Sequence, residues 1–146
     1  MGSFADSVLA NIATMKKEVN DQIVDTFIYA AKQTIQYSPS PSNSISDWAT
    51  GHLIDQWYPA HNSYSSELTT SKSDRGTNSM TRVDAFKGMN FFLKTDGELT
   101  LTNNVDYAVL ADREGWNPTE EHPNWKGKQA YYMVDLGIKD AKAKVG

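Results

Sequence analysis

The chain of 146 residues fits one structural domain of ordinary length, residues 1–146. Hydrophobic residues make up 39% of it and charged residues 22%, so it can bury a core and we expect it to fold, while the net charge of −4 argues against a nucleic-acid partner. The absence of cysteine excludes disulfides, thiolate nucleophiles and cysteine metal sites, and suits assembly in a reducing cytoplasm.

A long amphipathic helix is predicted from Phe4 to about Tyr37, a stretch without Gly or Pro in which apolar residues recur every three or four positions. Ser3, with Asp6 three residues later, is a candidate N-terminal cap. At 1.5 Å per residue the helix would be roughly 45–50 Å long, more than a domain of this size needs. We therefore expect part of it to pack on another subunit. The apolar residues are Phe4, Val8, Ile12, Met15, Val19, Ile23, Phe27 and Ala30.

A loop at residues 38–44 follows, because Pro39 and Pro41 cannot continue the helix. From Trp48 to Tyr58 the pattern predicts a short helical turn and then a strand.

The segment from Ala60 to Met80 is rich in Ser and Thr, and its main apolar residues are Tyr64, Leu68 and Met80. It cannot bury enough surface to offset an ordering cost of about 1–2 kcal/mol per residue. We predict a polar arm that is mobile in the free protein and becomes ordered against a neighbouring subunit or partner.

A second short helix is predicted to begin near residues 79–81, and a β-hairpin follows it. Asp96-Gly97 is a turn signal between Phe91–Thr95 and Glu98–Thr102, and the second of these segments alternates Leu with Thr as a half-buried strand does.

A third short helix is predicted for Val105–Glu114, followed by a loop with Trp and Pro at residues 115–125. The last element, residues 131–145, has helical spacing and ends in lysines, although Ala130–Ile138 could alternatively be a strand. A long N-terminal helix, a small antiparallel sheet with a hairpin, short helices and a C-terminal helix belong to the α+β class.

Few residues are candidates for chemistry, and we predict no catalytic, cofactor-binding or metal-binding residue. His52 and Asp55 could share one side of a helical turn, but no third ligand or nucleophile accompanies them. No serine lies in a nucleophile turn, and no Gly-rich phosphate loop or membrane-length apolar run occurs. An acidic cluster could hold a cation, yet its spacing fits no calcium loop and favours a solvated surface. It comprises Asp112, Glu114, Glu120 and Glu121.

Four tryptophans, Trp48, Trp57, Trp116 and Trp125, could line a sugar-binding groove or serve in the core and in subunit contacts. The second interpretation is favoured, because Trp116 and Trp125 lie in loop sequence where anchors between subunits would be useful.

Two fragments resemble the tail-completion or neck proteins of long-tailed bacteriophages, also described as minor tail or head–tail joining proteins. The first is Ser38-Pro39 followed by Thr50-Gly51-His52-Leu53, and the second is Asn103-Asn104-Val105-Asp106-Tyr107-Ala108 followed by Asp112 and Gly115. The order matches the family, with an insertion at residues 40–49 and His52 in place of a basic residue.

The resemblance implies a non-enzymatic structural protein of the virion neck or tail, assembled in the host cytoplasm. It implies a ring of six copies with heterologous contacts, because the family's ring joins a six-fold tail. The expected partners are further copies of the chain, the connector or stopper, the tail terminator and the tail tube, with no nucleic-acid sequence and no membrane. The alternatives are a carbohydrate- or small-ligand-binding module that uses the tryptophans, and a hydrolase that uses His52 and Asp55.

Overall fold

The computed structural model describes residues 4–41, 50–89, 97–114 and 130–145. The elements are α1 (Phe4–Tyr37), β1 (Trp57–His61), α2 (Thr77–Lys87), β2 (Leu99–Asn103), the π-helix η1 (Leu110–Glu114) and α3 (Met133–Val145). The protein is therefore of the α+β class, as predicted.

α1 has the predicted bounds and is 34 residues long, so it measures about 51 Å. It ends where Ser38 turns back onto the helix: its amide donates to the Ile35 carbonyl and its hydroxyl to the Thr34 carbonyl. Pro39 then prevents a further helical turn because it has no amide hydrogen. The predicted cap at Ser3 lies outside the described residues. No helix in the described part of the chain is long and apolar enough to cross a membrane.

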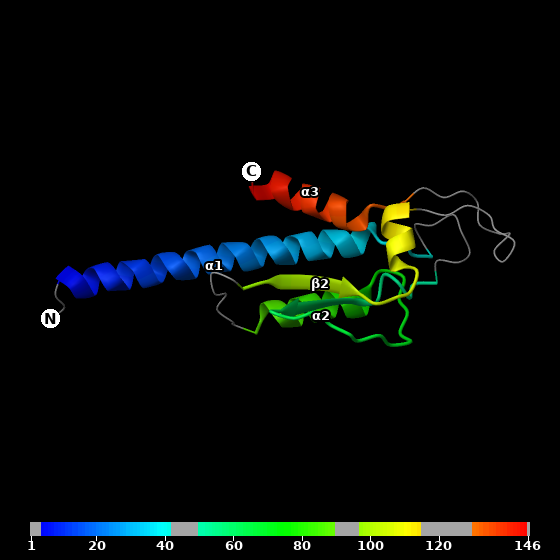
Figure 1. Ribbon diagram of the computed structural model, residues 1–146, viewed down its shortest axis with the longest axis horizontal. Coiled ribbons are helices and arrows are strands. Elements are labelled where there is room, and N and C mark those ends of the chain that lie inside the picture. The colour runs from blue at the N-terminus through cyan, green and yellow to red at the C-terminus, as the bar shows by residue number, and fades with distance from the viewer. Residues whose placement is uncertain (1–3, 42–49, 90–96, 115–129, 146) are drawn as a thin grey trace, which may run out of the picture.

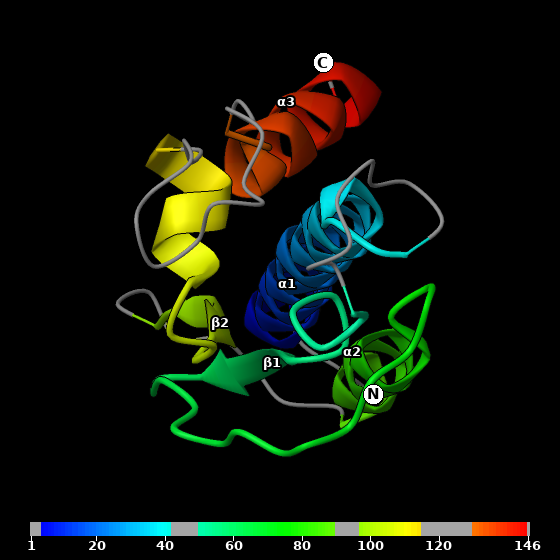
Figure 2. The same ribbon diagram turned by 90° about the vertical axis from the view of Figure 1, so that its right-hand side faces the viewer.

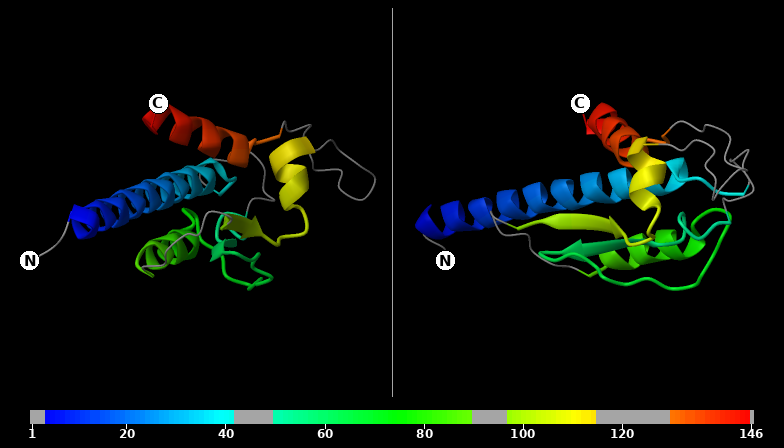
Figure 3. Two further views of the ribbon diagram at one scale, coloured as in Figure 1. Left: turned by 60° about the vertical axis from the view of Figure 1, so that its left-hand side comes forward. Right: turned by 45° about the vertical axis from the view of Figure 1, so that its right-hand side comes forward.

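The C-terminal half of α1 is the centre of the molecule. α3 lies along one side of it, and the sheet and α2 lie on the other (Figures 1 and 2). The N-terminal half of α1 extends beyond these described elements (Figures 1 and 3).

The sheet has two antiparallel strands, with Trp57 opposite Asn103 and His61 opposite Leu99. β2 corresponds to the second strand of the predicted hairpin, and its described partner is β1, which precedes α2 in the chain. The other predicted hairpin strand, residues 91–95, lies outside the described residues. The helical turn predicted before β1 is present, since the Asp55 amide donates to the His52 carbonyl.

α2 begins at Thr77, a few residues before the predicted start, and buries Val83 and Phe86 against α1. The Phe27 and Phe86 rings lie 5.8 Å apart in a tilted arrangement, a favourable geometry for aromatic pairs. One apolar core is formed by side chains of α1, α2, β1, η1 and α3 and of residues next to the two strands. It contains Ile28, Ala31, Ile35, Leu53, Ile54, Trp57, Val83, Phe86, Val105, Ala108, Ala111 and Met133.

The predicted helix Val105–Glu114 is present, with helical turns that pass into η1. The C-terminal element is helical from Met133, so the alternative strand at residues 130–138 is wrong. The helix is favoured because the three residues that α3 buries are spaced four apart. They are Met133, Gly137 and Ala141.

α3 packs against α1 at very short range around Gly137. A Cβ atom at Gly137 would lie 2.8 Å from the Ala30 carbonyl oxygen and still closer to Thr34 Oγ1. Glycine lowers helix propensity here by about 1 kcal/mol relative to alanine, but it permits the two backbones to approach. The Tyr37 hydroxyl, which donates to Asp140 at 2.8 Å, closes the same contact.

We predict that Gly137→Ala destabilises the protein by about 1–3 kcal/mol, because the strain of overpacking exceeds the gain in helix propensity. Urea unfolding followed by circular dichroism measures the change. Gly88→Ala is the matched control, since a Cβ there would make only ordinary contacts, at 3.5 Å or more. Equal stabilities of the Gly137 variant and the wild type would contradict the tight-contact explanation.

Candidate functional site

The most distinctive surface of the protein is an exposed apolar stripe on the N-terminal half of α1. Its residues follow one another at intervals of four, four, three, four and four, which places them on one helical face. All of them are exposed large hydrophobic side chains, and Phe4, at 87% exposure, is the most exposed. The stripe consists of Phe4, Val8, Ile12, Met15, Val19 and Ile23.

The stripe leads into an open groove of about 410 Å³ where α1 meets the end of α3 and the start of β2. The groove is apolar apart from Thr26 and one charged side chain, Lys142. Its lining is Ile23, Thr26, Phe27 and Ala30 from α1, Gly97 and Leu99, and Ile138, Ala141, Lys142 and Val145 from α3.

The stripe and the contact with α3 lie on the same face of α1. Ile23, Ala30 and Thr34 continue the spacing of the stripe, and Ala30 and Thr34 meet α3 at Gly137. α3 ends at Val145, which lines the same groove as Ile23. The face is therefore covered by α3 in its C-terminal half and exposed in its N-terminal half.

His52 and Asp55 do not form a reactive pair. His52 Nε2 lies 2.8 Å from the Thr69 carbonyl oxygen, whereas the Asp55 carboxylate accepts hydrogen bonds from the Ser73 hydroxyl at 2.6 Å and from the Asn78 amide groups. Asp55 is fully buried. It joins the turn before β1 to the start of α2, so its role is structural.

The pKa of Asp55 lies below its ordinary value. Burial opposes ionisation and is the largest single influence, but the hydrogen bonds from Ser73, Asn78 and Ser71 together outweigh it. The ionised carboxylate is consequently the form that the folded state stabilises.

The two fragments that carry the family resemblance meet in the fold. The Asn103 side-chain amide donates to the Leu53 carbonyl at 2.9 Å, and its oxygen accepts from the Val105 amide, which ends β2 in an Asx turn. Neither Asn103 nor Asn104 has a positive φ, so the turn is made by the Asn103 side chain and not by a left-handed backbone. Gly51 of the first fragment has a φ of 87°, a conformation that favours glycine.

Ser38 of the same motif set is buried at the end of α1 and accepts a hydrogen bond from Trp57 Nε1 at 2.9 Å. Trp57 is thus a core residue. The other three tryptophans, for which groove or interface roles were predicted, lie outside the described residues. They are Trp48, Trp116 and Trp125.

The polar arm, residues 60–80, forms hydrogen bonds with other parts of its own chain. Its first residues, Ala60 and His61, belong to β1, and residues 77–80 belong to α2. Thr69 and Ser71 lie between these two elements. The Thr69 amide donates to the side chain of the buried Gln56, and this side chain donates to the Ser71 carbonyl. Asn104 donates to two further carbonyl groups of the arm. Mobility of the arm in the free protein stays a prediction.

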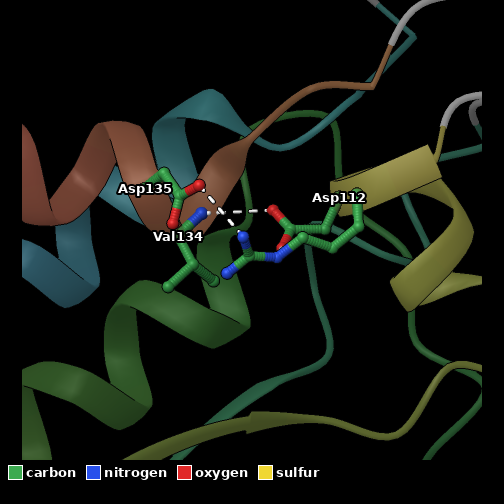
Figure 4. A network of polar contacts seen from close by, with 4 residues as sticks. Asp112, Val134 and Asp135 are labelled. Carbon is green, nitrogen blue, oxygen red and sulfur yellow. Dashed lines mark hydrogen bonds and ion pairs between the residues drawn. The ribbon is translucent and has the colours of Figure 1, made fainter.

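Asp112, from the predicted acidic cluster, caps α3 (Figure 4). Its carboxylate accepts from the Val134 amide at 3.2 Å and pairs with Arg113, which also contacts Asp135 at 3.0 Å. The Tyr132 amide donates to the Asp112 carbonyl and holds Tyr132 at a φ of 49°, a left-handed conformation that costs about 1–2 kcal/mol. Asp112 is therefore a helix cap. Glu120, Glu121 and the side chain of Glu114 lie outside the described residues.

Within the described ranges, no three His, Asp or Glu side chains gather as metal ligands would. Comparisons of the chain with protein-family models, with curated proteins and with solved structures find no significant match. The candidate function therefore depends on the stripe and the groove.

The sequence predicted the stripe but not the groove. The helical spacing of Phe4 to Ala30 marks the apolar face of α1 without any tertiary information. The groove depends on where α3 ends against α1, and no local pattern in the sequence gives that position. The partners of Asp55 were also missed, because Ser73 and Asn78 are separated from it by β1 and by the irregular part of the arm.

We predict that Asp55→Asn lowers the unfolding free energy at pH 7 by about 2–3 kcal/mol, because hydrogen bonds to a charged group are lost. The depressed pKa also fixes the pH dependence. Stability from the ionised carboxylate is complete above the unfolded-state pKa of about 3.9 and is lost as pH falls through the lower folded-state pKa. Wild-type stability should therefore fall more steeply below about pH 4 than that of the variant. Chemical unfolding from pH 2 to 7 measures both effects.

Asp84→Asn is the control for this experiment, since Asp84 is an exposed carboxylate paired with Lys32. It should cost less than about 1 kcal/mol at pH 7. Similar acid sensitivity in the Asp55 variant and the wild type would refute the assigned role.

We predict that Asp112→Ala costs about 1–2 kcal/mol through loss of the cap on α3. Asp135→Ala removes the other carboxylate that contacts Arg113 but keeps the cap, and should change stability by less than about 1 kcal/mol. Thermal unfolding of the two variants compares them directly. A loss at Asp135 as large as that at Asp112 would show that the ion pairs matter more than the cap.

Proposed function

We propose that this protein is a structural subunit of the neck or tail of a long-tailed bacteriophage. In this proposal the chain forms a ring, with six copies, that completes the tail and joins it to the head connector. It assembles in the host cytoplasm, becomes part of the virion, and contacts the connector or stopper, the tail terminator and the tail tube.

The observation that carries the assembly role is the stripe on α1. From Phe4 to Ile23 it is about 30 Å long, and at roughly 10 Å across it covers about 300 Å². The largest contiguous apolar patch on a soluble protein is typically about 300–600 Å² and is often functional. A helix that extends beyond its own body with such a face is suited to contact another subunit.

The family resemblance supplies the identity of the assembly. Its two fragments meet through Asn103 and Leu53, and its Ser38 contacts Trp57 in the core. These contacts give the motif residues scaffold roles, which suits a protein whose task is to hold a shape. The tryptophan-based sugar groove receives no such support, because Trp57 is buried.

The proposal is tested first on the free chain and then on virions. Native mass spectrometry across a wide concentration range should reveal species above the 16.3 kDa of one chain, with the largest closed form at six copies. Negative-stain electron microscopy should show rings. Antibodies against the chain should label the junction between head and tail in virions from cells that express the gene.

The control antigen is a capsid protein of the same virions, whose antibodies should label the head and leave the junction clear. A chain that stays monomeric at every concentration, and that antibodies do not find in virions, would falsify the proposed function.

A further inference from the structure

We propose that the stripe is a self-recognition surface, on which a second copy of this chain lays its own α1 in antiparallel orientation about a two-fold axis. The spacing of the stripe is palindromic. When the axis passes midway between Ile12 and Met15, Ile12 opposes Met15, Val8 opposes Val19, and Phe4 opposes Ile23 of the other copy. A two-fold contact requires this self-complementarity, in which residue i meets j and j meets i.

The same register fits the end of α3. α3 covers the apolar face of α1 as far as Ile23 and Val145, where the groove opens. In the pair, the first turn of α1 from the second copy begins at this point. From there the second α1 covers the apolar face of the first α1 as far as Phe4. Each Phe4, the most exposed large hydrophobic side chain among the described residues, enters the groove of the other copy. The two exposed apolar features are thereby covered by one contact.

Charge supports the arrangement at both ends and along the flanks. Asp6 lies in the first turn of α1, whereas the last turn of α3 carries Lys142 and Lys144. The positive N-terminus of one helix would follow the negative C-terminus of the other, which is favourable for helix dipoles.

Along the pair, the flanking positions bring no like charges together. Lys16 would lie beside Leu9 of the second copy, and Glu18 would lie beside Asn11. Asp21 lies on the outer side of the helix, away from the stripe, and Asp25, one heptad after Glu18 on the same flank, pairs with Lys87 of its own copy.

The area indicates a weak pair. The lateral surface of a helix 30 Å long and 10 Å wide is roughly 900 Å², and covering a third to a half of it on each copy buries roughly 600–900 Å² in total, before the grooves are counted. Stable complexes usually bury about 1,200–2,000 Å². We therefore expect pairing that depends on concentration in the micromolar range.

The pair concerns the free chain and does not depend on the proposed ring. A ring of six with heterologous contacts contains no two-fold pair, so the pair is a state of the free chain and would separate where the stripe contacts a ring neighbour. The experiments below identify the pair by its register and leave the ring to the tests of the proposed function.

The decisive experiment is cysteine cross-linking, because the chain has no cysteine of its own. Val8→Cys and Val19→Cys are made separately and then mixed under mild oxidation. The antiparallel register places Val8 of one copy beside Val19 of the other, so the mixture should give a disulfide-linked dimer. Two copies of Val8 would stand about 16 Å apart along the axis, so Val8→Cys alone should give little dimer.

Ala10→Cys is the matched control, since Ala10 is exposed on the opposite face of α1. Mixed with Val19→Cys it should give at least tenfold less dimer than Val8→Cys does. Dimers of Val8→Cys with itself, matched by Val19→Cys with itself, would show a parallel pair and overturn the proposal. Absence of cross-links at concentrations where the wild type still assembles would show that other surfaces form the assembly, and would overturn it too.

A charge placed at the two-fold axis gives a second, independent readout. Ile12→Glu should weaken dimerisation in analytical ultracentrifugation by at least tenfold, with an unchanged circular dichroism spectrum at monomer concentrations. Ala10→Glu adds the same charge to the outer face and should leave dimerisation within twofold of the wild type. Equal dimerisation of the two variants would contradict pairing through the stripe.

Discussion

α1 and α3 pack antiparallel along one apolar face of α1, but α1 has 34 residues and α3 has 13. The close approach at Gly137 fixes where along α1 the shorter helix lies. Because α3 then ends at the groove that Ile23 also lines, the position of this one contact decides how much of the face is covered and where the groove opens. A shift of α3 by one turn, about 5.4 Å, would move both. The candidate interaction surface is thus a consequence of helix packing rather than of a separate binding element.

The polar groups on the other side of the molecule have a different task. Asp55 and Gln56 are fully buried in the turn before β1, yet their side-chain atoms meet donors and acceptors from α2 and from the arm. A buried carboxylate without partners would be costly, whereas one that accepts several hydrogen bonds stabilises the elements it joins. These residues hold together an irregular segment with few apolar anchors. His52 and Asp55 form no reactive pair, because the Asp55 carboxylate accepts from Ser73 and Asn78 and the His52 ring lies at the Thr69 carbonyl.

The sequence predicted those features that depend on local periodicity. α1 follows from its unbroken apolar spacing and from Pro39, and the lysine-rich end of α3 follows from the same reasoning. Features that depend on contacts between distant residues were not predictable in this way. Pairing of β2 with β1 joins residues about 40 positions apart, and the cap that Asp112 provides for α3 spans 22 positions. The acidic cluster was expected on the surface because composition cannot show that the start of α3 lies beside the Asp112 carboxylate.

The exposed half of α1 connects stability with assembly. Isolated helices shorter than about 12–15 residues are marginally stable in water, and most helices in proteins are stabilised by the packing of their apolar face. The C-terminal half of α1 has this packing from α3, α2 and the sheet. The N-terminal half gains instead from its attachment to a formed helix, which removes the cost of nucleation, and from local pairs such as Lys17 with Asp21 at 2.9 Å. Such a pair contributes only a few tenths of a kcal/mol, so cover for the stripe is the larger source of stability still open to this segment. A partner that lies on the stripe would therefore stabilise the helix that it binds.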